Sequence, residues 1–185
     1  MDCNSNHSFE ESITYQNLQK AFEGEAVAST KYAIYGEKAR EQGYEQIANI
    51  FDETSYNERE HCTIWMKILK GGEIPDTLTN LQDAYGGESF EWKSMYLSYA
   101  QEARREGYTQ IAELFEGVAN IEHHHDARYR KLANNILTDQ VFCKRNKVVW
   151  ICLNCGNLIY DECAPECCPV CGYPKGFFQI NCENY

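Results

Sequence analysis

The sequence predicts an all-α four-helix bundle with one long crossover, followed by a small C-terminal metal-binding knuckle domain. Three observations lead to this prediction. A 64-residue repeat runs through the first two thirds of the chain, Glu-x-x-His recurs at the same place in both copies, and seven of the ten cysteines fall in the last 34 residues. We expect the bundle to occupy residues 1–140 and the small domain residues 149–185, with a linker over about 137–148.

The repeat relates segment 32–61 to segment 96–125 without a gap, and 12 of the 30 positions are identical. The identical pairs are Tyr32/Tyr96, Tyr35/Tyr99, Ala39/Ala103, Arg40/Arg104, Gly43/Gly107, Tyr44/Tyr108, Gln46/Gln110, Ile47/Ile111, Ala48/Ala112, Phe51/Phe115, Glu58/Glu122 and His61/His125. This agreement at a fixed spacing indicates two copies of one supersecondary unit.

Each copy is predicted to form two helices joined by a short glycine turn, which makes it an antiparallel helical hairpin. The predicted helices span about 14–41, 44–70, 88–105 and 108–136. Along the second and fourth helices, the inward positions alternate spacings of four and three, as the core seam of a bundle helix does. These positions are Ile47, Phe51, Thr54, Glu58, His61, Trp65 and Ile68, and then Ile111, Phe115, Val118, Glu122, His125, Tyr129 and Leu132.

The connection between the two hairpins is predicted to be long. Because the copies repeat, the first and third helices should point the same way, so the connection must travel the length of the bundle. The stretch 71–87, with glycine pairs and Pro75 as breakers, can extend about 55 Å, and a helix of this size is about 39 Å long. The predicted topology is therefore ferritin-like.

The seam places carboxylates and imidazoles where a core should be apolar. Glu58 and His61 share one helix face, as do Glu122 and His125, because residues three apart are neighbours on a helix. A single Glu-x-x-His is weak evidence, but two copies in register on the seam are strong. Burying unpaired carboxylates costs several kcal/mol each, so a bound cation is expected.

The odd-numbered helices add three further carboxylates: Glu25, Glu88 and Glu91, the last standing where the first copy has Ala28. One Glu from each of two helices, with Glu-x-x-His from each of the other two, is the donor set of di-iron and di-manganese carboxylate bundles. Oxygen donors with a few imidazole nitrogens suit iron or manganese better than zinc. His123 and His124 are expected to flank this site.

The second copy of the repeat contains one extra residue before its tyrosine. Glu25 precedes Tyr32 by seven residues, whereas Glu88 precedes Tyr96 by eight. If both glutamates and both tyrosines are in register, the third helix must absorb one extra residue. A π-bulge between Glu88 and Tyr96 is therefore predicted, since this is how helices accommodate an insertion near functional sites.

The C-terminal cysteines form a two-knuckle pattern. Cys152-x-x-Cys155-Gly and Cys168-Pro-x-Cys171-Gly predict a tetrathiolate metal site, in which each glycine permits a tight turn. A structural zinc ribbon shares this spacing, so zinc stays open beside iron. Aromatic residues are expected to form a small dry core beside the metal, which favours iron; they are Trp150, Tyr160, Tyr173, Phe177 and Phe178.

The remaining cysteines are Cys3, Cys62, Cys143, Cys163, Cys167 and Cys182. With no secretory signal at the polar N-terminus, free thiols are expected rather than a disulfide framework. Cys167 could replace Cys168 as a ligand, but the Cys-Pro-x-Cys-Gly pattern favours Cys168.

The net charge and the distribution of apolar residues restrict the expected binding partners and the cellular compartment of the protein. A net charge of −11 argues against nucleic acid, because the phosphate backbone would be repelled. The sequence has no apolar run long enough to span a membrane. A cytoplasmic protein is the expectation.

Both halves together resemble rubrerythrin, a family that joins a ferritin-like di-iron domain to a rubredoxin-like domain. The resemblance covers nearly the whole chain from about residue 14. The motifs that carry it are Ala-Phe-Glu-Gly-Glu at 21–25, Glu-Arg-Glu-His at 58–61, Gly-Glu-Ser-Phe-Glu at 87–91, Ala-Arg-Arg-Glu-Gly-Tyr at 103–108, Glu-His-His-His at 122–125 and the two cysteine knuckles.

The resemblance implies roles for the ligands. Glu58 and Glu122 would bridge two irons, which are oxo-bridged when oxidised. Glu25, with Glu91 or His61, would complete one iron, and Glu91 would exchange for His61 on reduction. Glu88 and His125 would complete the other iron. Tyr32 and Tyr96 would hydrogen-bond ligand carboxylates, and a third iron would sit on Cys152, Cys155, Cys168 and Cys171.

The resemblance also implies reduction of hydrogen peroxide to water in defence against oxidative stress. Electrons would come from an NAD(P)H-dependent reductase or rubredoxin through the tetracysteine iron, in a homodimer or higher oligomer. Three alternatives stay open: a ferroxidase or iron-storage protein, a manganese catalase, and a non-enzymatic regulator with a zinc ribbon.

Overall fold

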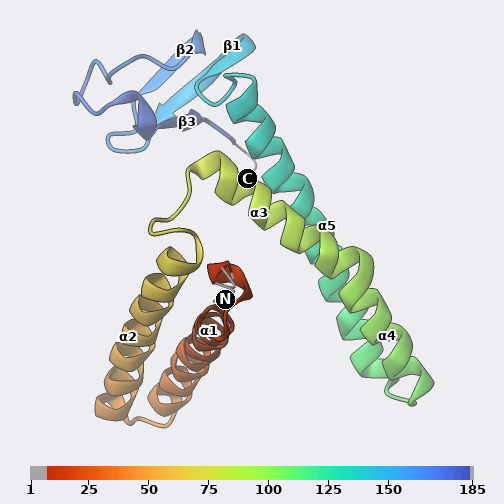
Figure 1. Ribbon diagram of the computed structural model, residues 1–185. Helices are drawn as coiled ribbons and strands as arrows, with labels where there is room; N and C mark the ends of the chain where they lie inside the picture. The colour runs from red at the N-terminus through yellow and green to blue at the C-terminus, as the bar shows by residue number, and fades with distance from the viewer. Residues whose placement is uncertain (1–7, 184–185) are drawn as a thin grey trace, which may run out of the picture. The chain divides into compact units, whose positions relative to one another are not determined.

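The computed structural model describes residues 8–183 (Figure 1). The chain divides into two compact units after Pro75, and each is described by itself. Cys3, expected as a free thiol, lies outside the described residues. None of the helices described in residues 8–183 is both long and apolar enough to cross a membrane.

The first unit is a helical hairpin. After a 3₁₀ turn at Phe9–Glu11, α1 spans Ile13–Glu41 and α2 spans Glu45–Leu69, and the two helices pack side by side. The Ser12 hydroxyl caps α1 by accepting a hydrogen bond from the Tyr15 backbone N–H at 3.0 Å. Gly43, at φ 81°, makes the turn between the helices, as predicted.

The second unit continues the repeat with one difference at its start. It contains α3 at Thr77–Phe90, a π-helical turn at Glu91–Met95, α4 at Tyr96–Arg105 and α5 at Thr109–Leu137. The third helix was expected to begin near residue 88, which is wrong. Asp76 caps α3 by accepting from the Thr79 backbone N–H at 2.9 Å, so Gly86 and Gly87 lie inside the helix. The connection from α2 to α3 is therefore residues 70–76, not 71–87.

The predicted π-bulge is confirmed. Residues Glu91–Met95 form a π-helical turn between α3 and α4, inside the interval between Glu88 and Tyr96 that contains the extra residue. The same turn carries Glu91. The turn therefore restores the register of Tyr96 and also carries a carboxylate where the first copy has Ala28.

Small residues set the spacing of the helices within each hairpin. Ala48 and Ala112, which are repeat equivalents, are both fully buried, and Ala39 and Ala103 are 7% exposed. In the first hairpin a Cβ on Gly36 would lie 2.5 Å from the Asp52 carboxylate oxygen, so a larger residue would displace this carboxylate, which accepts a hydrogen bond from Arg40. Larger seam residues keep much of their surface exposed, because a pair of helices buries only the strip between them. Examples are Ile47, Ile68, Ile111 and Leu132, which are 40–49% exposed.

The C-terminal part of the second unit is a three-stranded antiparallel sheet with strand order β2-β1-β3. The strands are β1 at Cys143–Cys152, β2 at Leu158–Cys163 and β3 at Phe178–Ile180. Trp150 is fully buried at the centre, and its indole N–H donates to the Asp161 carbonyl at 3.1 Å. Of the five aromatic residues expected in this core, Trp150 and Phe178 are buried, whereas Tyr160 is 67% exposed because it alternates outward on β2.

Two expectations about this region are wrong. The linker was placed at about 137–148, but β1 already begins at Cys143, which leaves only residues 138–142 between α5 and the sheet. Cys143 was expected as a free thiol, but it forms a disulfide with Cys163. The reason is the strand register, which pairs the two cysteines across β1 and β2 with their Cα atoms 4.0 Å apart.

A buried carboxylate joins the π-helical turn to α5. Asp126 is 5% exposed and accepts hydrogen bonds from the Trp92 indole N–H at 3.0 Å and from Arg130 Nε at 2.5 Å. Burial acts to raise the pKa of Asp126, but the hydrogen bonds from Trp92 and Arg130 outweigh it and hold the pKa below its usual value. The carboxylate is therefore stabilised in its charged form.

Replacing Asp126 with Asn should lower the free energy of unfolding by about 1–3 kcal/mol at pH 7, because the charged hydrogen bonds are lost. A depressed folded-state pKa contributes stability above the unfolded-state value of about 3.9, and this contribution fades as the pH falls through the folded-state pKa. The difference between the variant and the parent should therefore shrink below about pH 4.

Urea unfolding at pH 7 and at acidic pH measures this difference. The control is Glu113→Gln, which removes an exposed carboxylate from the same helix. A difference between Asp126→Asn and the parent that stays constant with pH would contradict the charged hydrogen-bond account.

Candidate metal centres

The first hairpin brings three ligand side chains together. Glu58 and His61 lie one turn apart on α2, and Glu25 reaches them from α1. His61 Nδ1 lies 2.8 Å from Glu58 Oε2 and 3.5 Å from Glu25 Oε1. The three donor atoms lie within 4.8 Å of one another, which is close enough to share one metal ion.

The second unit repeats this arrangement. Glu122 and His125 lie one turn apart on α5, and Glu88 reaches them from α3. His125 Nδ1 lies 2.7 Å from Glu122 Oε2 and 3.5 Å from Glu88 Oε2. The distances match those of the first group to within 0.1 Å, so the repeat in the sequence is also a repeat of a ligand group.

The negative charges in the second ligand group favour the binding of a cation. Burial raises the pKa of Glu88, and the hydrogen bond and negative charge of Glu122 raise it further, while His125 opposes them. Two carboxylates this close cannot both stay ionised without compensation. A bound metal ion supplies that compensation, and the mixed oxygen and nitrogen donors suit iron.

Glu91 extends the second group from the π-helical turn. Its negative charge contributes to raising the pKa of both Glu88 and Tyr96. It is not one of the three donors that converge most closely. Exchange of Glu91 for His61 stays a prediction.

The two tyrosines of the repeat occupy equivalent surroundings. The ring of Tyr32 lies 6.1 Å from that of Phe51, and the ring of Tyr96 lies 6.1 Å from that of Phe115. Burial raises the pKa of Tyr96, and the charges of Glu91, Glu122 and Glu88 raise it further. Tyr96 is therefore a protonated phenol beside the ligand carboxylates. The hydrogen bonds expected from both hydroxyls stay predictions.

His123 and His124 lie outside the ligand group, as expected. His123 packs on the Trp92 ring at 4.4 Å between ring centroids, and His124 lies 3.3 Å from the Arg128 guanidinium. Trp92 and Asp126 were not predicted from the sequence as part of this site. An aspartate directly after the ligand His125 and a tryptophan directly after Glu91 were the available signals.

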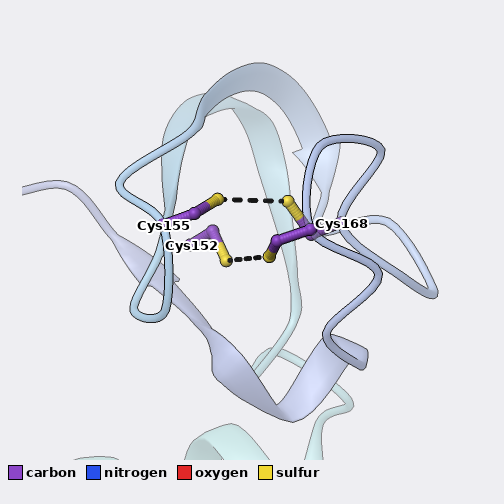
Figure 2. A group of neighbouring side chains, drawn as sticks. Cys152, Cys155 and Cys168 are labelled. Atoms are coloured by element: carbon purple, nitrogen blue, oxygen red, sulfur yellow. Dashed lines mark hydrogen bonds between the residues drawn. The ribbon is translucent and has the colours of Figure 1, made fainter.

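The four knuckle cysteines converge as predicted. Figure 2 shows Cys152, Cys155 and Cys168 with their sulfur atoms turned toward a common centre. The Sγ atoms of Cys152 and Cys171 are 3.7 Å apart, and those of Cys155 and Cys168 are 3.6 Å apart. Four thiolates around a tetrahedral ion with metal–sulfur bonds of about 2.3 Å should be about 3.8 Å apart. The cluster already has the size of such a site.

Glycine turns form both knuckles. Gly156 and Gly172 have φ values of 76° and 73°, and their backbone N–H groups donate to the carbonyls of Cys152 and Cys168 at 2.8 and 2.9 Å. Only glycine adopts this left-handed backbone without strain. Cys167, the alternative ligand, is exposed and outside the four-sulfur cluster, so the choice of Cys168 is confirmed.

Two asparagines that were not predicted as part of the site, Asn154 and Asn157, lie close to the knuckle cysteines and interact with them. The Asn154 side chain and the Tyr173 backbone N–H lower the pKa of Cys171 to about 6. The Asn157 side-chain amide lies 4.0 Å from the Cys168 sulfur. Cys155 receives a backbone hydrogen bond from Asn157 that lowers its pKa, but burial and the neighbouring thiols together raise it to about 12. The four sulfurs thus compete for protons, which a metal ion would displace.

Helical hairpins with repeated Glu, Glu and His ligand groups, together with a tetracysteine knuckle, define a two-part iron protein with carboxylate and thiolate sites. The family model described as rubrerythrin matches residues 16–133 and 79–148, and the model described as the rubrerythrin, rubredoxin-like domain matches residues 150–179. The chain belongs to the rubrerythrin family, whose members are di-iron oxidoreductases.

Three relatives illustrate the similarity. The chain is 40% identical to rubrerythrin of Clostridium perfringens and 38% identical to rubrerythrin-1 of Clostridium acetobutylicum, with 93% of this chain and 96% of each relative covered. It is 38% identical to rubrerythrin of Nitratidesulfovibrio vulgaris, with 94% of this chain and 96% of the relative covered. The Glu, Glu and His groups and the four cysteines fit the iron sites of this family.

Removing Ser94 should convert the π-helical turn into regular α-helix. Glu88 and Glu91 would then rotate by about 100° relative to Tyr96 and α4. We expect the shortened protein to bind less iron at the second ligand group while keeping its helix content. Iron analysis and circular dichroism measure the two effects, with Ser94→Ala as the control. Iron content equal to that of the control would show that the π-helical turn does not position the ligands.

Replacing Cys168 with Ser should remove one iron per chain and abolish the visible absorption of ferric thiolate. The matched control is Cys167→Ser, the adjacent cysteine outside the cluster, which should leave both unchanged. Metal analysis and the aerobic visible spectrum provide the readouts. Zinc in place of iron at the parent knuckle, or loss of colour in Cys167→Ser, would contradict the assignment.

Proposed function

We propose that this protein reduces hydrogen peroxide to water, using electrons from an NAD(P)H-dependent reductase that pass through the tetracysteine iron. The observation that carries the proposal is the presence of duplicated carboxylate–histidine groups and a tetrathiolate cluster in one chain. The first is suited to binding and reducing an oxygen compound, and the second to transferring single electrons. A ferroxidase or storage protein has no need of the second.

The proposal assigns the ligands as the family resemblance does. Seven side chains would hold two irons: Glu25, Glu58, His61, Glu88, Glu91, Glu122 and His125. Bound there, two ferrous ions would supply the two electrons and the Lewis acidity that cleavage of the O–O bond requires. The seven side chains were inferred together from the repeat and from the motifs, and the contacts within each hairpin support six of them directly.

The chain's own residues would supply orientation and proton control. The Glu58 and Glu122 carboxylates lie 2.8 and 2.7 Å from Nδ1 of His61 and His125, so each pair presents its oxygen and nitrogen donors toward one metal ion. Reduction of one peroxide to two waters consumes two protons, and the Tyr96 hydroxyl is a protonated group beside Glu91 and Glu122. We propose that Tyr96 donates a hydrogen bond within this site and that Tyr32 does so in the first copy.

The knuckle would act as an electron relay. Its sulfurs lie near tetrahedral spacing on two glycine turns, so little rearrangement should accompany a change of iron charge. We further propose that the protein works in the cytoplasm as a homodimer or higher oligomer. In such an oligomer the knuckle of one subunit would serve the di-iron centre of another.

Peroxide turnover can separate the two parts of the mechanism. With NADH and a rubredoxin reductase, the parent should consume one NADH per peroxide, and both Glu58→Ala and Cys168→Ser should lose about 100-fold or more in rate. When the protein is instead chemically reduced beforehand, Cys168→Ser should still reduce one peroxide per di-iron centre, whereas Glu58→Ala should not. Cys167→Ser serves as the matched control in both assays.

The outcomes discriminate between functions. Parent-like peroxide reduction by Glu58→Ala would remove the di-iron centre from the mechanism. Rapid oxidation of added ferrous iron without NADH-linked peroxide turnover would favour a ferroxidase. Oxygen release from peroxide without any reductant would favour a catalase.

A further inference from the structure

The disulfide between Cys143 and Cys163 lies where the β1–β2 hairpin is otherwise weakly paired. Cys143 is the first residue of β1 and Cys163 the last of β2. The next paired residues are Val148 and Asp161, so residues 144–147 bulge out opposite Glu162 alone. The bond thus closes the open end of the hairpin, beyond a bulge that interrupts the regular pairing of the two strands.

Neither cysteine of the pair is fully buried. Cys163 is exposed, and Cys143 is half-buried beside a surface cavity of about 330 Å³ that is lined also by Ile136, Asp139 and Lys175. The metal-cluster cysteines Cys152 and Cys168, by contrast, are 1% and 2% exposed. A peroxide or thiol therefore has better access to Cys143 and Cys163 than to Cys152 and Cys168, whereas Cys155 is exposed and Cys171 is half-buried.

The bulge also supplies positive charge. Lys144, Arg145 and Lys147 lie in the bulge, where the Lys144 ammonium donates to the Gln140 carbonyl and the Lys147 ammonium lies 3.7 Å from the Asp161 carboxylate. Cations near a cysteine favour the thiolate, which is the form that attacks peroxides and disulfides. Cys143 lines the surface cavity, so we assign it as the attacking cysteine and Cys163 as the resolving one.

The bond encloses half of the metal cluster. The loop between Cys143 and Cys163 contains Cys152 and Cys155, the whole first knuckle. Beside the bond, the Ala164 backbone N–H donates to the Phe142 carbonyl at 2.8 Å, and Ala164 packs into the core around Trp150. A covalent link at this end restricts the opened hairpin more than the folded one, and so opposes opening.

We propose that Cys143 and Cys163 are a reversible dithiol–disulfide pair, a redox modification site that stabilises the tetracysteine domain when peroxide is present. The Cys143 thiolate attacks one peroxide oxygen; the O–O bond breaks, a sulfenic acid forms, and the departing hydroxide takes a proton to become water. Cys163 then attacks the sulfenic sulfur, the S–S bond forms, and the second oxygen leaves as water. Two thiols are oxidised as one peroxide is reduced. A dithiol reductant restores the pair by thiol–disulfide exchange.

Peptide mapping tests the chemistry. The full-length iron-loaded protein is reduced with dithiothreitol, freed of reductant without oxygen, treated with one equivalent of peroxide or none, and alkylated. Without peroxide, Cys143 and Cys163 should both be alkylated. With peroxide, the two peptides should be linked, with a mass two hydrogen atoms below the sum of the reduced peptides. The link should form in the Cys182→Ser variant as in the parent. No such link should form in Cys143→Ser.

Two results would overturn the proposal: full alkylation of both cysteines after peroxide, or a bond that dithiothreitol does not reduce. The same mapping in Glu58→Ala distinguishes this proposal from the peroxidase function. That variant should still form the bond, whether or not the di-iron centre reduces peroxide.

Iron release tests the consequence. On challenge with a chelator, decay of the ferric-thiolate absorption should be slower in the oxidised parent than in the reduced parent, by on the order of tenfold. The double variant Cys143→Ser/Cys163→Ser should release iron at one rate under both conditions. Equal rates in the two redox states of the parent would refute the stabilising role without depending on how the variant folds.

Discussion

The convergence of two carboxylates and an imidazole inside each helical hairpin is the constraint on which the helical part of this protein depends. The four glutamate side chains are only 15–30% exposed. A partly buried carboxylate beside a second carboxylate is destabilising unless a proton or cation compensates it. The histidine Nδ1 atoms, at 2.7–2.8 Å from one glutamate and 3.5 Å from another, show the same solution in both copies. The surrounding helices approach through alanine and glycine, so their own packing leaves the polar groups close together rather than separating them.

The second copy of the repeat differs from the first at one place, the π-helical turn, and this turn carries additional functional side chains. The π-helical turn inserts a residue, introduces Glu91 where the first copy has Ala28, and presents Trp92 to the buried carboxylate of Asp126. Asp126 directly follows His125, so one buried hydrogen bond connects the turn that carries one carboxylate to the helix that carries two other ligands. A π-helical turn would otherwise be a weak point of the helix. Anchoring it through Trp92 holds an added functional group in a defined position.

The periodicity of the sequence was sufficient to predict the metal-ligand residues. It was not sufficient to predict where the helices and strands begin and end. Glu58, His61, Glu122 and His125 could be predicted because a 64-residue repeat and a helical period both report on the same positions. The extra residue before Tyr96 was likewise visible as a break in the repeat. The start of α3 was not, since Gly86 and Gly87 resemble a loop in sequence, whereas the cap at Asp76 and the packing of α3 on α5 decide the outcome. Strand register has no such local signal, and the pairing of Cys143 with Cys163 depends on it entirely.

In the small tetracysteine domain, a few covalent and metal–ligand bonds supply stability that a hydrophobic core supplies in a larger fold. Its buried cluster consists of Trp150, Cys152, Ala164, Cys168 and Phe178, and two of these five are sulfur ligands. So few buried side chains cannot by themselves offset the conformational entropy of ordering the chain. The sulfur cluster fixes the turn end of the β1–β2 hairpin, and the disulfide fixes its open end. A hairpin held at both ends has little freedom to rearrange when the charge at its metal changes, and that rigidity is the property an electron relay requires.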